Sequence, residues 1–132
     1  MLTKTIQQSE YFPASCQAVY DLIMDAEKHS AFTGMPVITS SEVSGIFDVF
    51  EGYCTGFNIE LQPGKRIVQA WHFREEGWPT DHYSICTFLF EPEGNGTRLT
   101  FTQTGVPEHS VKALEHGWTQ YYWEPMREYL DA

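Results

Sequence analysis

Hydrophobic residues recur along the chain with two different spacings, and each spacing predicts one kind of element. Between Pro107 and Leu130 they return every three to four positions, which predicts a long amphipathic helix. Between Pro36 and Gly105 apolar and polar residues alternate in short runs separated by glycine and proline turns, which predicts consecutive antiparallel strands. We therefore expect a long C-terminal helix that packs against a sheet.

Three residues of the predicted helix need an explanation. Ser110 is a candidate N-cap, and Pro125 predicts a kink because proline lacks the N–H that continues the helix. Gly117 costs about 1 kcal/mol in a helix interior relative to alanine. Two explanations stay open for Gly117. It could let a strand or loop approach and seat Trp118 inward, or it could serve close helix–sheet packing alone.

The N-terminal third predicts one strand followed by two short helices. Residues 3–12 alternate and end at a proline, Ser15 is placed to cap a first helix, and Asp25 to cap a second that ends at Gly34. The predicted fold class is α+β. A curved antiparallel sheet of about seven strands wraps around the C-terminal helix, with two short helices between strands 1 and 2. We expect residues 1–132 to form one domain.

The strand phases predict which side chains face the helix. Aromatic and aliphatic residues share one phase, and Gln69 and Gln103 fall on the same predicted inward face. Buried amides need partners, so we expect these two glutamines to orient a ligand in a cavity between helix and sheet. The alternative is that each aromatic residue only packs in the core. The predicted inward face also contains Phe90 and Leu99. The predicted ligand-binding residues are Phe57, Ile59, Gln69, Trp71, Phe73, Phe88, Phe101, Gln103, Trp118 and Tyr122.

Charge and composition narrow the classes of partner. The formal net charge is −10, from 18 acidic and 8 basic residues, which disfavours nucleic acid and anionic membranes. No apolar run approaches the roughly 20 residues of a membrane-spanning helix, and the N-terminus lacks a secretory leader pattern. Cys16, Cys54 and Cys86 are widely spaced in apolar surroundings, which predicts buried free thiols and a cytoplasmic location.

Motifs for catalysis or metal binding are not evident in the sequence. The five histidines have no partner at metal-ligand spacing, and we expect them on the surface or in turns, with His82 fixing its loop. Asp48, Glu51 and Glu60 could form a carboxylate cluster for acid–base catalysis. Glu60 lies in the polar phase of its strand, however, so we expect it to be exposed to solvent. We predict no catalytic residue, no metal and no cofactor.

The order of the predicted elements resembles the helix-grip fold of the START lipid-transfer domains and the birch-pollen-allergen-like proteins. Within it, a series of fragments resembles the C-terminal domain of the activator of heat-shock protein 90 ATPase. The similarity runs from about Asp48 to Leu130, and more loosely back to Gln7. The fragments are Phe50-Glu51-Gly52 to Gly56 and residues 63–71 (PGKRIVQAW), 77–84 (GWPTDHYS), 96–99 (GTRL), 105–107 (GVP) and 117–123 (GWTQYYW).

The resemblance implies a fold with a cavity and a class of partner. In the eukaryotic activator this domain is the second of two and contacts the N-terminal domains of the chaperone. Three functions stay open at this point. The first is a non-catalytic domain that binds a small hydrophobic or aromatic ligand. The second is an interaction domain that regulates a heat-shock protein 90 type chaperone. The third is a cyclase or hydrolase, since such enzymes occur on this fold.

Overall fold

The alternating segments form one seven-stranded antiparallel sheet in the computed structural model, which describes residues 1–131. The strand order is β1-β7-β6-β5-β4-β3-β2, so β2 to β7 form a meander and β1 joins its far edge beside β7. The hairpin between β6 and β7 closes with Glu93 opposite Gly96, as the Gly94-Asn95 turn predicts. The strands are β1 (Thr3–Phe12), β2 (Val37–Ile38), β3 (Ile46–Val49), β4 (Cys54–Gln62), β5 (Arg66–Phe73), β6 (Ser84–Glu93) and β7 (Gly96–Pro107).

Two short helices follow β1, and both begin with the predicted caps. Helix α1 (Cys16–Met24) starts where the Ser15 hydroxyl accepts a hydrogen bond from the Ala18 N–H at 3.1 Å. Helix α2 (Ala26–Thr33) starts where the Asp25 carboxylate accepts from Lys28 N–H at 3.1 Å, and it ends at Gly34 with φ of 75°. These local signals confirm the predicted pair of helices between the first two strands.

The C-terminal helical run changes its winding halfway along. It consists of the 3-10 turn η1 (Glu108–Ser110), α3 (Val111–Trp118), the π-helical turn η2 (Thr119–Trp123) and α4 (Glu124–Asp131). Pro125 cannot donate to the Tyr121 carbonyl, and we attribute to this the widened turn that ends just before α4. Ser110 precedes α3, but its hydroxyl makes no cap hydrogen bond and the predicted N-cap is wrong. Ser110 itself has helical dihedrals, and its hydroxyl donates instead to Glu75 Oε1 at 3.2 Å.

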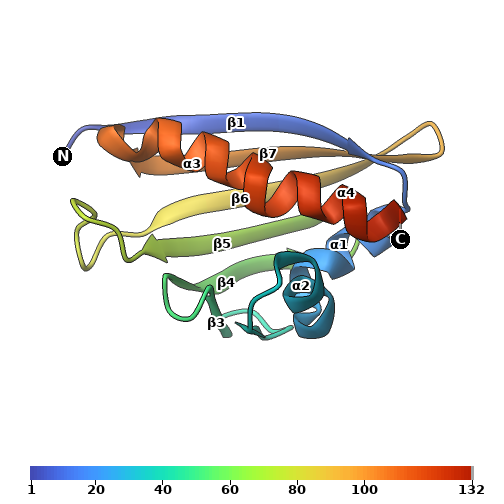
Figure 1. Ribbon diagram of the computed structural model, residues 1–132, viewed down its shortest axis with the longest axis horizontal. Helices are drawn as coiled ribbons and strands as arrows, with labels where there is room; N and C mark the ends of the chain where they lie inside the picture. The colour runs from blue at the N-terminus through green and yellow to red at the C-terminus, as the bar shows by residue number, and fades with distance from the viewer. Residues whose placement is uncertain (132) are drawn as a thin grey trace.

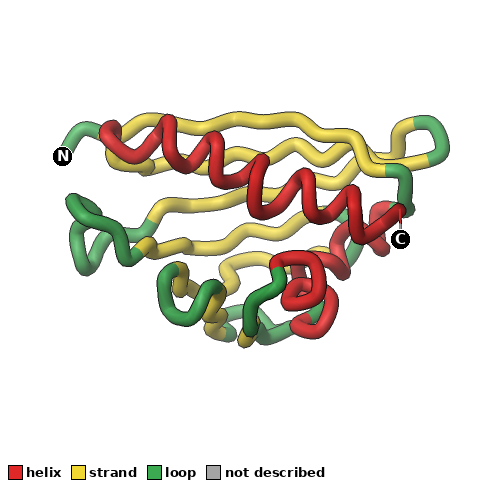
Figure 2. The backbone as a smooth tube through the Cα atoms, in the orientation of Figure 1, coloured by secondary structure: helices red, strands yellow, loops and turns green. Residues whose placement is uncertain are grey.

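The C-terminal run crosses one face of the sheet, and the core lies between them (Figure 1). Figure 2 shows the long helix lying diagonally over the strands, with the two short helices near the C-terminal end. Trp71, Phe88, Phe101, Trp123 and Met126 are fully or almost fully buried between these layers. The predicted fold, a sheet that packs around a long terminal helix, is therefore confirmed. Within residues 1–131, no helix is long and apolar enough to cross a membrane.

The side chains around Phe57 in strand β4 face the opposite side of the sheet from the one predicted. Phe57 and Ile59 are 37% and 41% exposed and do not face the helix, whereas Gly56 and Asn58 face inward. A Cβ on Gly56 would lie 1.8 Å from the Ala70 carbonyl oxygen and 2.6 Å from the ring of Phe47. This inward position therefore has no room for a large side chain. The register also shifts between Asn58 and Glu60, which leaves Ile59 as the extra residue of a bulge.

Candidate functional site

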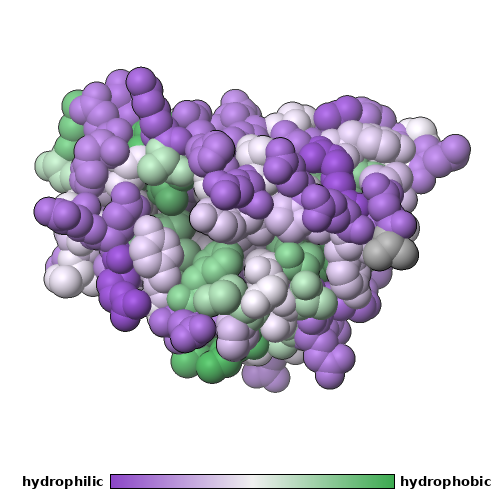
Figure 3. Space-filling model, in the orientation of Figure 1, coloured by the Kyte–Doolittle hydropathy of each residue, from purple (hydrophilic) through white to green (hydrophobic). Residues whose placement is uncertain are grey.

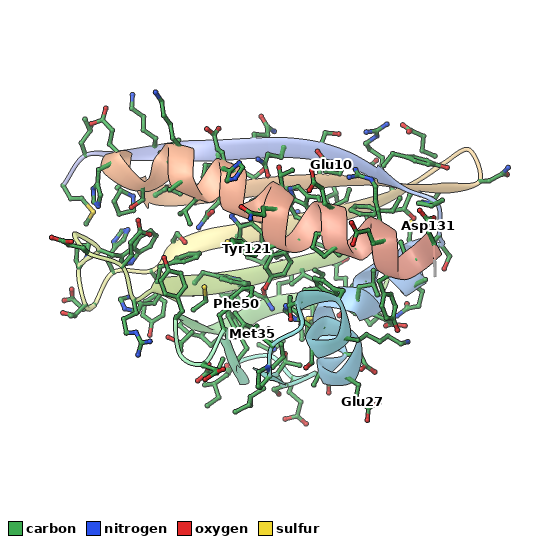
Figure 4. All side chains as sticks on the ribbon, in the orientation of Figure 1. Glu10, Glu27, Met35, Phe50, Tyr121 and Asp131 are labelled. Carbon is green, nitrogen blue, oxygen red and sulfur yellow. The ribbon has the colours of Figure 1, made fainter. Side chains whose placement is uncertain are left out.

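A groove of about 520 Å³ runs between the C-terminal helix and the sheet. Figure 3 shows hydrophobic and pale residues gathered below this helix, framed by hydrophilic ones. In Figure 4, Tyr121 reaches from the helix toward Phe50 and Met35 on the opposite side. We call this space the groove. Its lining residues are Thr33, Met35, Phe50, Tyr53, Cys54, Trp71, Phe73, Glu75, Ala113, Leu114, Gly117, Trp118, Tyr121 and Tyr122.

Aromatic rings in successive contact form most of the groove wall. The rings of Tyr53 and Phe73 meet edge to face at 6.2 Å, and Phe73 stacks on Trp71 at 5.8 Å. Trp71 in turn meets Trp118 at 5.1 Å, and Trp118 meets Tyr122 at 4.8 Å. These edge-to-face and tilted arrangements are the favourable ones for aromatic pairs. The rings therefore form a continuous series of contacts from the end of β5 to the middle of the helix.

Buried amides fix the two tryptophans of the wall. The Trp71 indole N–H donates to Gln69 Oε1 at 2.9 Å, and the Trp118 indole N–H donates to Gln103 Oε1 at 2.8 Å. The Gln69 amide donates to Asn58 Oδ1, and the Gln103 amide donates to the Ser84 hydroxyl, both at 2.9 Å. The protein itself thus satisfies both glutamines, and neither lines the groove. We expected the two glutamines to orient a ligand, but they instead hold the indole rings of Trp71 and Trp118 in place.

The structure divides the ten predicted residues into three groups. Trp71, Phe73, Trp118 and Tyr122 line the groove. Phe88 and Phe101 pack behind Trp118, with ring centroids 6.0 and 4.4 Å from it, and Gln69 and Gln103 lie behind the wall as described. Phe57 and Ile59 lie on the opposite face of the sheet, so their predicted place in the cavity is wrong. The predicted set therefore contains four residues of the groove wall, four that lie behind it and two on the outer face of the sheet.

The turn between β3 and β4 brings Phe50 and Tyr53 to the groove. Phe50 and Glu51 both have positive φ, 56° and 54°, a conformation that costs on the order of 1 kcal/mol for each side chain. The turn is held by the Gly52 N–H, which donates to Asp48 Oδ1 at 2.7 Å. The Phe50 ring meets Tyr121 edge to face at 5.9 Å. No hydrophobic periodicity marks this turn, so the sequence pattern did not indicate that either aromatic residue lines the groove.

Gly117 opens the groove rather than allowing a close contact. A Cβ at this position would meet one atom within 4 Å, Cδ2 of Tyr121 at 3.9 Å, which is an ordinary van der Waals distance. Neither explanation drawn from the sequence, approach of a strand or close packing of helix on sheet, fits this open space. The missing side chain instead leaves room in the groove itself.

Glu75 places a carboxylate at the end of the aromatic wall. It lies two residues after Phe73, in the same inward phase as Trp71 and Phe73, so the alternation in the sequence contains a signal for its position. The hydroxyl of Ser110 donates to Oε1 at 3.2 Å, and the hydroxyl of Tyr53 lies 3.5 Å from Oε2. Burial and the nearby Glu75 charge raise the pKa of Tyr53. They also raise the pKa of the Cys54 thiol well above its usual value, so both groups stay neutral.

His29 is buried next to Tyr122, which corrects the prediction that the histidines lie on the surface or in turns. Its side chain is 3% exposed and stacks on Phe32 at 5.1 Å. Nδ1 lies 3.0 Å from the Ile23 carbonyl oxygen, so Nδ1–H donates there and Nε2 accepts from the Tyr122 hydroxyl at 2.7 Å. Burial lowers the pKa of His29 to about 4 and raises that of Tyr122 well above its usual value. The pair is therefore neutral, with Tyr122 in the groove wall and His29 behind it.

His82, by contrast, fixes its loop as predicted. Its Nε2 lies 2.6 Å from the Gly105 carbonyl oxygen, which ties the loop between β5 and β6 to β7. The His82 carbonyl oxygen accepts from the Trp78 indole N–H at 2.8 Å. The loop is thus closed by its own hydrogen bonds, and neither residue lines the groove.

Comparison with known proteins places this fold among activator homologues. A family model described as "Activator of Hsp90 ATPase homolog 1-like protein" matches residues 13–131. An activator of 90 kDa heat shock protein ATPase homolog from Dictyostelium discoideum is 33% identical over 117 residues, which are 88% of this chain and 30% of that protein. The mouse homolog 2 is 25% identical over 129 residues, covering 98% of this chain and 38% of that protein. The chain thus spans about a third of the length of these curated relatives.

Solved structures show the same fold at lower sequence identity. An HSP90 activator from Plasmodium falciparum superposes with a TM-score of 0.88 at 24% identity, covering 96% of each chain. A protein from Mesorhizobium loti superposes with a TM-score of 0.84 at 17% identity, covering 97% of each chain. With the family model matching nearly the whole sequence, this chain belongs to the Activator of Hsp90 ATPase homolog 1-like family.

Proposed function

We propose that this protein binds a small apolar molecule in the groove and that binding, rather than a reaction, is its biochemical activity. The observation that carries the proposal is the continuous aromatic wall facing a space of about 520 Å³. Ligand sites typically have roughly 300–1,000 Å³ and mostly apolar walls with few polar groups. The space left beside Gly117 supports the same proposal, because a core packed only for stability has few voids.

A dye-binding experiment with two matched variants tests this proposal. Nile red, a neutral apolar dye, is titrated into wild-type protein, Gly117→Leu and His116→Leu, and fluorescence is recorded. Leucine at position 117 would occupy the groove, whereas His116 is exposed and does not line it. We expect wild type and His116→Leu to bind and Gly117→Leu to bind at least about tenfold more weakly. Equal binding by all three variants, or none by the wild type, would contradict the proposal. Native mass spectrometry of the gently purified protein would then identify a natural ligand.

A second candidate function is interaction with a heat-shock protein 90 type chaperone. The relatives named as activators of that ATPase suggest it, and so does an apolar patch on the outer face of the sheet. In this patch Ile46, which is 72% exposed, pairs with Phe57, and the Phe57 ring contacts Tyr83 at 5.5 Å. Exposed apolar patches of this kind are typical of protein-interaction sites.

Patch and groove variants separate the two candidates. Ile46→Ser with Phe57→Ser removes the outer patch and leaves the groove lining unchanged. We expect this variant to lose any binding to the host chaperone in a pull-down and any effect on its ATPase rate, while it retains Nile red. If the wild type shows no chaperone binding at micromolar concentration, this second function is wrong.

The arrangement gives less support to catalysis. His29 contacts Tyr122, but His29 lies behind the wall. The Tyr122 hydroxyl already donates its proton to His29, so it is not free to donate that proton to a substrate. Within the groove lining, which falls entirely in residues 1–131, Glu75 is the one residue with a carboxyl group. A single carboxylate supports recognition of a ligand group more directly than an acid–base pair.

A further inference from the structure

We propose that the groove selects ligands with a positively charged nitrogen attached to an apolar body, with Glu75 and the aromatic wall as the selecting groups. This inference rests on the proposed ligand-binding function and names the ligand class. Of the fourteen lining residues, all within the described range 1–131, Glu75 has a carboxylate and none is lysine, arginine or histidine. The groove therefore has a fixed negative charge and no fixed positive charge.

The Glu75 carboxylate has capacity left for a ligand. It takes part in none of the three ion pairs that residues 1–131 form, which join Arg66 to Glu60, Arg98 to Glu93 and Arg127 to Glu10. Its hydrogen bonds come from neutral hydroxyls, at 3.2 Å from Ser110 and 3.5 Å from Tyr53. A carboxylate offers about four acceptor positions, so an ammonium group can bind without displacing these hydroxyls.

The wall beside Glu75 suits the rest of such a cation. Tyr53 contacts both Glu75 and Phe73, and Trp71 continues this series of aromatic rings toward the helix. Aromatic faces attract ammonium groups, and tryptophan attracts them most strongly. We therefore expect the cationic end to lie between Glu75 and Tyr53, with the apolar body extending along Phe73 and Trp71. The net charge of −10 would further raise the local concentration of cations.

Three probes on one carbon skeleton test the charge preference. 4-Phenylbutylamine, 4-phenylbutanol and 4-phenylbutyrate carry a cationic, a neutral and an anionic end at neutral pH. Binding is measured by isothermal titration calorimetry to wild type, Glu75→Gln and Glu76→Gln. The two variants change the net charge equally, but Glu76 is exposed and does not line the groove. Glutamine at position 75 keeps the size of the side chain and one carbonyl acceptor.

We expect wild type and Glu76→Gln to bind the amine about tenfold more tightly than the alcohol, and the carboxylate most weakly. In Glu75→Gln the preference for the amine should fall to about threefold or less, with circular dichroism and melting temperature unchanged. Equal binding of amine and alcohol by the wild type would overturn the charge preference and leave apolar binding intact. The same holds if Glu75→Gln retains the full preference. Failure of all three probes would also overturn this inference, and the Nile red titration then decides the proposed function separately.

Discussion

Acid should destabilise this protein through His29. The imidazole is enclosed by Phe32 and Tyr122, and its Nδ1–H is committed to the Ile23 carbonyl. Burial disfavours the charged form, which lowers its pKa from 6.5 to about 4 in the folded state. Above the unfolded pKa both states are neutral. As the pH falls from 6.5 toward 4, the unfolded state takes up a proton that the folded state resists, so stability is lost across this window.

The size of the effect follows from the two pKa values. At about 1.4 kcal/mol per pKa unit, the difference between 6.5 and about 4 corresponds to about 3 kcal/mol in total. Most of this, about 2 kcal/mol, should be lost between about pH 7 and about pH 4.5. Native proteins are stable by roughly 5–15 kcal/mol, so a loss of this size moves a denaturation midpoint measurably.

Urea denaturation at several pH values, followed by circular dichroism, measures this loss. His29→Gln retains an oxygen that can accept from Tyr122 and removes the titrating group, so its free energy of unfolding should fall less with acid than that of the wild type. His116→Gln removes an exposed imidazole and is expected to follow the wild type. If wild type and His29→Gln lose stability in parallel between about pH 7 and about pH 4.5, the assigned role of His29 is wrong.

Three further substitutions test other features of the structure by the same urea assay. Gly117→Ala should raise the free energy of unfolding by up to about 1 kcal/mol, because a methyl group meets open space there; a loss would contradict the groove at this position. Gln103→Leu should lower it by roughly 2 kcal/mol, because it leaves the buried Trp118 indole N–H without an acceptor; no change would contradict that role. Asp25→Ala should cost about 1 kcal/mol through loss of the α2 cap, and a neutral result would contradict the capping.

Local chemistry explains why most of the fold could be predicted from the sequence. Ser15 and Asp25 each cap a helix by accepting a hydrogen bond from a backbone N–H three residues later, and the Gly94-Asn95 turn closes a hairpin between adjacent strands. The switch from a period of two to a period of three to four marks the boundary between sheet and terminal helix. Because these signals depend on near neighbours, they indicate the elements and their order without tertiary information.

The features that the sequence did not reveal depend on contacts between distant segments. The close approach of Gly56 to Ala70 and the bulge at Ile59 determine which side chains of β4 face the helix. Alternation of apolar and polar residues predicts neither feature. His29 lies on a helix with little hydrophobic pattern, and its burial depends on Tyr122, 93 residues later. Phe50 reaches the groove from a turn with positive φ, a conformation rare for aromatic residues. Of the groove residues that the sequence did not reveal, Glu75 is the one whose position could have been predicted, because it continues the inward phase of β5.

The indole N–H signals of the four tryptophans provide the most direct test of the groove as a binding site. Trp71 and Trp118 line it, whereas Trp78 and Trp123 do not. In nitrogen-15 NMR spectra titrated with 4-phenylbutanol and 4-phenylbutylamine, we expect saturable shifts of the Trp71 and Trp118 signals. The Trp78 and Trp123 signals should change far less, and Gly117→Leu should abolish the response. Shifts confined to Trp78 or Trp123, or an unchanged response in Gly117→Leu, would contradict ligand binding in the groove.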